Sequence, residues 1–249
     1  MEHKIAVVIN YCSNDKRFIS KCLQQALLIS DLVIVPVSTH LYGGDLENLE
    51  SIKELKQLFP QVNFIIFEWK DGKHPRYWHN MARLIGSKEV PDLYSWVLFL
   101  DADEILDNKL FNRFVSGSEF NNYDSYKLGC YWYFREPIYQ AKSYEDSPVL
   151  IRTNLININP YDIISEREQM CEHLDARKQL KVLQEDKPMV HHYSWVRSKE
   201  EMLNKVRNWG HISDKDWVTL VEQEFSGDFS GTDFIHGYQY NIVENIFNI

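Results

Sequence analysis

Three carboxylates crowd into four positions directly after a short apolar run. The run covers residues 96–100, and the acids are Asp101, Asp103 and Glu104. A short segment that is apolar on both faces and rich in β-branched and aromatic residues is typical of a central strand in a covered sheet. The acids then lie at the carboxyl end of that strand, the edge at which open α/β sheets bind ligands. Carboxylates this close repel each other unless a cation lies between them, and oxygen ligands suit Mg²⁺ or Mn²⁺, which could bridge the protein to a diphosphate.

The same acids also suit the first turn of a helix. Carboxylates are favourable at a helix N-terminus, and Asp101 or Asp103 would then cap a helix over residues 106–114. The density of charge favours the ligand site, but the residue types leave both interpretations open.

Strand-like and helix-like segments alternate up to the acids. The expected strands cover residues 5–9, 32–37, 62–67 and 94–100, and the expected helices cover residues 17–29, 46–59 and 75–87. This alternation predicts right-handed βαβ units and a mostly parallel central sheet flanked by helices. Residues that follow each strand should therefore meet at one ligand-binding edge, among them Asn10, Asp15 and Ser38.

The expected helix over residues 75–87 has two different faces. Its apolar face consists of Trp78, Met81, Ala82 and Ile85, and its polar ridge consists of Arg76, Asn80 and Arg83. Two arginines and an amide near the strand ends could contact a phosphate or a nucleoside. An ordinary solvated helix face is the alternative.

Beyond residue 123 the alternation gives way to extended, aromatic-rich segments. In this smaller mixed β region a long strand is expected over residues 126–135, a strand or hairpin over residues 148–158, and another over residues 188–195. His191 and His192 lie in the last one, and only one of them is expected at a site because successive strand residues face opposite sides. A neutral imidazole would complete a metal site begun by Asp103, and an ordinary hydrogen-bonded histidine is the alternative.

A helix is expected directly after these histidines. Ser198 and Glu201 have the spacing of a capping box, and Gly210 suits the end of the helix. Lys205 lies on this helix and could face an anionic ligand or solvent equally well.

Composition narrows the class of protein. The 249 residues are 44% hydrophobic and 14% aromatic, as expected of an ordered globular protein, and the net charge of −9 argues against a broad nucleic-acid-binding face. Four cysteines without a CxxC pair suggest reduced thiols. With neither a secretory leader nor a stretch of membrane-spanning length, we expect a cytoplasmic protein without a transmembrane segment.

Three motifs together resemble the GT-A glycosyltransferases, especially the family 2-like enzymes. The motifs are residues 10–15 after the first strand, residues 80–83 (Asn-Met-Ala-Arg), and residues 100–104 (Leu-Asp-Ala-Asp-Glu), which look like the DxD signature. The resemblance is strong over residues 4–107. It implies a single GT-A domain with a Rossmann-like sheet, divided into a nucleotide-sugar-binding half (1–107), an acceptor-side half (108–197) and C-terminal helices with a tail (198–249).

The resemblance also implies roles for the site residues. Asp101 would contact ribose or a metal-bound water, Asp103 would bind Mn²⁺ or Mg²⁺, and His192, with His191 as the alternative, would be a further ligand. The residues implied at the nucleotide sugar are Asn10, Asp15, Ser38, Asn80, Arg83, Asp101 and Lys205.

The implied reaction transfers a sugar from a nucleoside-diphosphate sugar to a hydroxyl of a glycan, glycoprotein or glycolipid, with inversion. A carboxylate would deprotonate the acceptor hydroxyl. Glu172 is the first choice for this base, Glu166 the second, and Asp146 remains open.

Three other functions deserve comparison. A nucleotidyltransferase on a related sheet would normally have a glycine-rich basic loop after the first strand, whereas residues 11–16 contain no glycine. A phosphatase of the haloacid dehalogenase type would have its Asp-x-Asp near the chain start. A non-catalytic module that binds sugar nucleotides or glycans would keep the metal site without a base.

Overall fold

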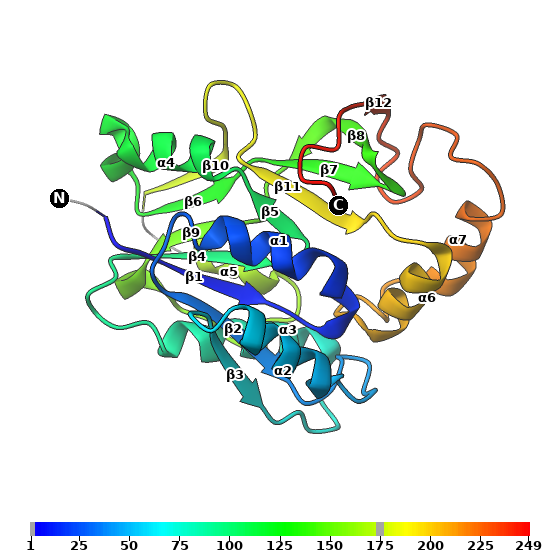
Figure 1. Ribbon diagram of the computed structural model, residues 1–249, viewed down its shortest axis with the longest axis horizontal. Coiled ribbons are helices and arrows are strands. Elements are labelled where there is room, and N and C mark those ends of the chain that lie inside the picture. The colour runs from blue at the N-terminus through cyan, green and yellow to red at the C-terminus, as the bar shows by residue number, and fades with distance from the viewer. Residues whose placement is uncertain (1–2, 173–176) are drawn as a thin grey trace.

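The computed structural model describes residues 3–172 and 177–249, and two β-sheets form the frame of this part of the chain (Figure 1). The larger sheet has the strand order β10 (Lys178–Val182), β6 (Ser125–Leu128), β9 (Val149–Arg152), β4 (Trp96–Asp101), β1 (Ile5–Asn10), β2 (Val33–Ser38) and β3 (Asn63–Phe67). The block from β4 through β1 and β2 to β3 is parallel, whereas β9 runs antiparallel to both β4 and β6. The expected strand–helix alternation up to the acids is confirmed.

The second sheet is mixed. Its strand order is β12 (Tyr240–Ile242), β8 (Glu136–Glu145), β7 (Cys130–Phe134), β11 (Val190–Trp195) and β5 (Glu104–Leu106). β11 runs parallel to β7 and antiparallel to β5. The fold is therefore α/β, with a mostly parallel central sheet and a smaller mixed sheet, as the sequence predicts.

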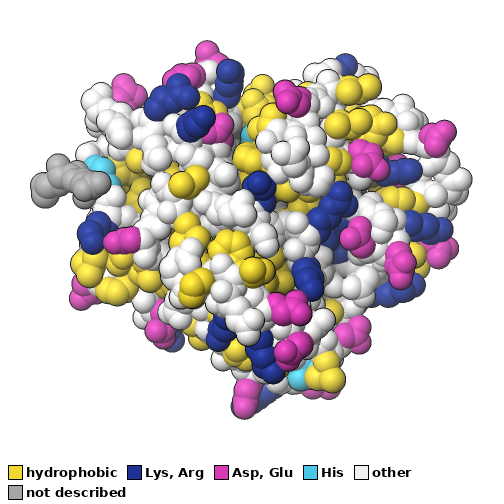
Figure 2. Space-filling view, in the orientation of Figure 1, with side chains coloured by type: hydrophobic (Ala, Val, Ile, Leu, Met, Phe, Trp, Pro, Cys, Tyr) yellow, Lys and Arg dark blue, Asp and Glu magenta, His cyan; other side chains and the backbone are white. Residues whose placement is uncertain are grey.

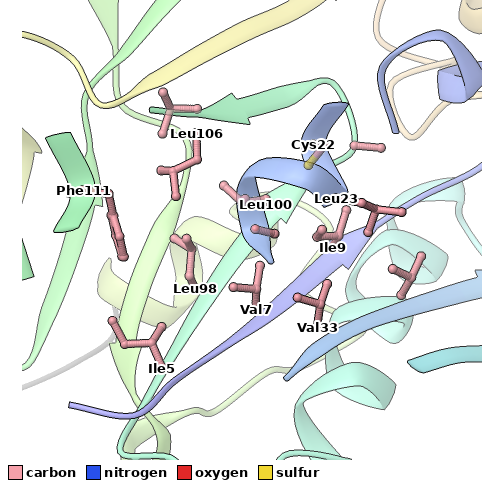
Figure 3. Packing of buried hydrophobic residues seen from close by; sticks show 14 of the residues in the cluster. Ile5, Val7, Ile9, Cys22, Leu23, Val33, Leu98, Leu100, Leu106 and Phe111 are labelled. Atoms are coloured by element: carbon pink, nitrogen blue, oxygen red, sulfur yellow. The ribbon is translucent and has the colours of Figure 1, made fainter. Parts of the chain in front are cut away.

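Helices cover both faces of the larger sheet. On one face, α1 (Lys16–Ala26), α2 (Leu49–Leu58) and α4 (Asn108–Ser116) pack in one hydrophobic core. On the other face, α3 (Pro75–Lys88) and α5 (Gln169–Glu172) pack in a second core. Side chains of β1 alternate between the two, so that Val7 and Ile9 join the core with Leu23 of α1 while Val8 joins the opposite one (Figure 3). Two further helices, α6 (Lys199–Asn208) and α7 (Trp217–Glu224), follow the end of β11 (Figure 1).

The single long strand expected over residues 126–135 is wrong. Gly129 separates β6 from β7, and these two strands belong to different sheets. A Cβ atom at Gly129 would lie 2.6 Å from Leu183 and 3.0 Å from the Val182 carbonyl oxygen. The chain thus passes from one sheet to the other at a point where β10 approaches too closely for a side chain.

The helix-capping interpretation of the acidic motif is also wrong. Residues 104–106 form strand β5, and the next helix begins at Asn108. Its cap is Asp107, whose carboxylate accepts hydrogen bonds from the backbone N–H groups of Lys109 and Leu110. Asp101 and Asp103 are left free of a capping role and lie in the connection between the two sheets.

Helix α3 buries polar residues as well as apolar ones. Trp78 and Ala82 are buried as expected, but Asn80 and Arg83 are 0% and 2% exposed. The alternative of a solvated face therefore fails for these two residues. Close packing reaches the backbone at Gly86, where a Cβ atom would lie 2.5 Å from Val8 and 2.9 Å from Pro36.

The net negative charge is not concentrated in one patch on the face drawn in Figure 2. Asp and Glu side chains alternate there with Lys and Arg, and several basic side chains lie over the region between α1 and α6. Across the described residues, none of the helices has the length and apolar character needed to cross a bilayer.

Candidate active site

A cavity of about 520 Å³ opens at the carboxyl ends of β1 and β4. Its walls come from both sheets and from α3, α6 and α7. Eight of the predicted site residues reach this cavity from segments far apart in the sequence, namely Asn10, Asp15, Arg83, Asp101, Asp103, Glu166, His192 and Lys205. The volume lies in the range of small-molecule sites, which is about 300–1,000 Å³.

The acidic motif joins the two sheets at the cavity. Asp101 ends β4 in the larger sheet, and Glu104 begins β5 in the second. Backbone hydrogen bonds fix the turn on both sides, from the N–H of Ala102 to the carbonyl of Asn10 and from the N–H of Tyr193 to the carbonyl of Asp103. The two aspartates are thereby held at the junction between the two sheets.

Asp103 is surrounded by cations. Its Oδ2 lies 2.6 Å from Lys205 Nζ and 3.6 Å from an Arg197 nitrogen, and its Oδ1 lies 3.5 Å from His192 Nε2. Burial alone would raise the pKa of the Asp103 carboxyl, but the attraction of Lys205 and the hydrogen bond with His192 outweigh it and hold this pKa well below its usual range. Asp103 is therefore an ionised carboxylate in a buried network.

Asp101 and Glu104 share a second network. Arg167 donates to both Glu104 oxygens, at 2.7 and 2.5 Å, and also lies 3.7 Å from Asp101. Arg83 donates to Asp101 at 2.9 Å. Burial opposes ionisation of Asp101, but Arg167 and Arg83 together lower the pKa of its carboxyl. Glu104 also accepts the Asp101 N–H at 2.8 Å, so this side chain shapes the turn itself.

Asn10 and Asp15 occupy the wall formed by the end of β1. The Asn10 amide oxygen accepts a hydrogen bond of 2.7 Å from the Tyr42 hydroxyl. Asp15 forms an ion pair with Arg197 and lies 3.6 Å from Lys205 Nζ. The Lys205 ammonium therefore lies between Asp15 and Asp103.

The carboxylates expected as bases differ in environment. Glu166 lies 2.9 Å from His79, 3.3 Å from Arg76 and 3.6 Å from Arg83. Burial opposes ionisation of Glu166, but His79 and the neighbouring cations lower the pKa of its carboxyl strongly, which makes it a weak base. Nearby Glu168, which also lines the cavity, has a raised pKa because burial outweighs the attraction of Arg167.

Of the other two base candidates, Asp146 is not brought to the cavity, and Glu172 stays an untested prediction. Asp146 lies outside the lining, where it pairs with Lys127 at 3.4 Å. Its neighbours Glu145 and Ser147 do line the cavity. Glu172 ends α5, and its side chain lies outside the described part of the chain.

Three predicted binding residues are also buried elsewhere. Ser38 accepts a hydrogen bond from the N–H of His40, Asn80 donates to the carbonyl of Asp162, and the Nδ1 of His191 shares a hydrogen bond of 2.7 Å with the Tyr133 hydroxyl. None of the three lines the cavity. Burial lowers the pKa of His191 to about 4, so its imidazole is neutral, and the strand alternation of β11 directs His192 to the site instead.

Sequence reasoning missed Arg167 and Arg197. Both are buried, at 4% and 3% exposure, and both bind the acidic cluster. Each is a single basic residue in a segment without periodicity, so no local pattern marked it. The available signal was the acidic motif itself, because carboxylates that are buried together need cations from elsewhere in the chain.

The arrangement of the motif does not fit a resident divalent ion. The Asp103 oxygen nearest Lys205 is occupied by that ammonium group, and both Asp101 oxygens face arginines. Within residues 3–172 and 177–249, no group of three or more His, Cys, Asp or Glu side chains is arranged to hold a metal. The assignment of Asp101, Asp103 and His192 as ligands therefore stays a prediction from the residue types and the sequence resemblance.

Comparisons with known proteins place the fold but no family. Neither a protein-family model nor a curated protein matches this sequence. Among solved structures, the mannosyltransferase PcManGT from Pyrobaculum calidifontis, in complex with GDP-Man and Mn²⁺, is 11% identical; the match covers 83% of this chain and 61% of that one, with a TM-score of 0.50. S. aureus TarS is 13% identical, with 81% and 38% of the two chains covered and a TM-score of 0.50.

Nucleotidyltransferases are similar as well. The inositol-1-phosphate CTP transferase from T. maritima is 8% identical, with 89% of this chain and 97% of that one covered and a TM-score of 0.47. At these identities the likeness to PcManGT and TarS shows a shared fold, and the weaker third match adds nothing finer. The fold is thus one that this chain shares with PcManGT and TarS.

Proposed function

We propose that this protein is a glycosyltransferase that moves a sugar from a nucleoside-diphosphate sugar to an acceptor hydroxyl of a glycan, glycoprotein or glycolipid. The observation that supports it most is the cavity at the carboxyl ends of β1 and β4, into which Asn10, Asp15, Asp101, Arg83 and Lys205 converge. The polar side chains are of types that bind a base and a ribose, and the buried cations are of types that bind phosphates. The cavity therefore suits a nucleoside diphosphate.

Another part of the cavity wall suits a sugar. Four tryptophans from the second sheet, α7 and the segments next to α6 line it, namely Trp132, Trp195, Trp209 and Trp217. Aromatic rings pack well against the apolar faces of sugar rings. We accordingly assign residues 1–107 to the donor nucleotide, residues 108–197 to the acceptor side, and residues 198–249 to completing the site within a single domain.

Glu168 is the proposed general base. It lines the cavity, and its raised pKa makes it a better proton acceptor than Glu166, whose charge is stabilised by His79. In an inverting transfer the acceptor oxygen bonds to the anomeric carbon while its proton passes to the Glu168 carboxylate. The bond from the anomeric carbon to the phosphate oxygen breaks, and the nucleoside diphosphate leaves with the electron pair.

An assay that follows two products separates the enzyme classes. The protein is incubated with a panel of nucleoside-diphosphate sugars and sugar acceptors, and separately with nucleoside triphosphates and sugar phosphates. Release of nucleoside diphosphate from the first panel supports the proposal. Release of pyrophosphate from the second alone would establish a nucleotidyltransferase, and donor binding without turnover would establish a binding module.

Matched variants test the base. Glu168→Gln should lower turnover at least a hundredfold, because general-base catalysis contributes about 10²–10⁴-fold. Asp146→Asn makes the same chemical change outside the cavity lining and should keep turnover close to that of the unmodified protein.

A further inference from the structure

Side chains alone balance the charge around the acidic motif. The carboxylates are Asp15, Asp101, Asp103 and Glu104, and the cations are Arg83, Arg167, Arg197 and Lys205. Every one of these carboxylates forms an ion pair with at least one of these cations. The four negative charges are thus matched by four positive charges without a divalent ion.

Lys205 is one of the firmly held cations that face the cavity. Its Nζ lies 2.6 Å from Asp103 Oδ2, 2.9 Å from Ser194 Oγ and 3.6 Å from Asp15. The side chain is 8% exposed and still contributes to the cavity wall. Helix α6, which carries it, begins with a complete capping box at Ser198, so the ammonium group is mounted on a well-formed helix.

A divalent ion on Asp103 would compete with this ammonium group. Mg²⁺ binds carboxylate oxygens at about 2.0–2.1 Å. An ion at that distance from Oδ2 would share one oxygen with Lys205 Nζ, which already lies 2.6 Å away. Two cations on one buried oxygen repel each other strongly, because a buried site screens charge poorly. A divalent ion on this oxygen and the Lys205 ammonium group therefore compete for the same position.

We propose that the Lys205 ammonium replaces the divalent cation of this site, so that the protein binds and releases its nucleoside diphosphate without a metal ion. This inference rests on the proposed function. Lys205 contacts the diphosphate, and as the bond from the anomeric carbon to the phosphate oxygen breaks, the added negative charge on the departing group is stabilised by the fixed positive charge of the ammonium. Arg197 is a positioning residue, since it holds Asp15 and Asp103 on either side of Lys205. A preorganised cation of this kind needs no reorganisation during the reaction.

Calorimetric titration with nucleoside diphosphates tests the proposal. UDP, GDP, CDP and dTDP are each titrated into the unmodified protein, once in EDTA and once in excess Mn²⁺. We expect the tightest binder to have the same Kd within threefold in both conditions. In Lys205→Met its affinity should fall at least tenfold, whereas Lys199→Met, an exposed lysine on the same helix outside this cavity, should leave it unchanged.

The unmodified protein alone is decisive, so the test stands even if Lys205→Met does not fold. A nucleoside diphosphate that binds tenfold or more tightly with Mn²⁺ than in EDTA would overturn this inference and leave the proposed function standing. Failure of every nucleoside diphosphate to bind in both conditions would overturn the proposed function as well. Loss of the free Mn²⁺ resonance in electron paramagnetic titration of the protein without nucleotide would also contradict the inference.

Discussion

Replacing Glu104 by glutamine tests the buried ion pair between Glu104 and Arg167, which fixes the turn at residues 101–104. Glu104 is 0% exposed and Arg167 is 4% exposed, and the guanidinium group contacts both carboxylate oxygens. Glutamine keeps the shape of the side chain and an acceptor for the Asp101 N–H, but it removes the negative charge and turns an N–H₂ group toward Arg167, donor against donor. Arg167→Met is the complementary change.

The structure sets the expected size of the effect. Breaking a buried ion pair on one side costs about 3–5 kcal/mol, because the remaining charge stays buried without its partner. Arg167 keeps Asp101 at 3.7 Å, which places Glu104→Gln at the lower end, about 3 kcal/mol. With an unfolding entropy of about 2.1 cal/mol/K per residue, 249 residues convert this loss into a decrease in Tm of about 6 °C.

A double-mutant cycle measured by urea unfolding separates the pair from its surroundings. Glu104→Gln, Arg167→Met and the double variant are compared at equal m-values, with fluorescence and circular dichroism required to report one transition. We expect the double variant to lose at least about 2 kcal/mol less than the sum of the single losses. Additivity within about 0.5 kcal/mol would refute the argument that the charges depend on each other.

Other features of the structure give equally direct tests. Gly86→Ala should destabilise the protein, although alanine normally favours a helix by about 1 kcal/mol, because the new Cβ would lie 2.5 Å from Val8; thermal unfolding checks the sign. Asp233→Ala should cost about 2–4 kcal/mol of folding stability, because its buried carboxylate accepts three backbone N–H groups and the Tyr240 hydroxyl. The same change should make residues 232–239 cleavable in limited proteolysis with a protease other than trypsin. The acid limb of the turnover–pH profile should lie above the usual carboxyl range of about 4.3, since Glu168 has a raised pKa and must be ionised to act; a limb at or below that range would contradict its role.

The fold of residues 3–107 was predictable because its signals are local. The strands and helices up to residue 101 follow apolar periodicity, and Pro60 follows closely after the end of α2. The edge at which Asn10, Asp15, Asp101 and Asp103 meet then follows from parallel topology alone. His192 was likewise one of two adjacent candidates that strand alternation had to separate.

The cations were not predictable because their signals are long-range. Arg167 and Arg197 reach the acids across 63 and 182 positions of sequence, and no spacing rule connects such residues. The prediction of a single strand over residues 126–135 failed for a similar reason. The structure divides residues 125–134 between two sheets, and this division could not be foreseen. It depends on how closely β10 approaches Gly129, which is a property of tertiary packing.

The order of the charges along the chain has a consequence for biosynthesis. Asp15, Asp101, Asp103 and Glu104 leave the ribosome well before Arg167, Arg197 and Lys205. In a nascent chain that has only reached β5, Arg83 is the one of these four cations that has already been made. The buried ion pairs of this edge can therefore be completed only after α6 has been synthesised, when the last part of the polypeptide packs against the first.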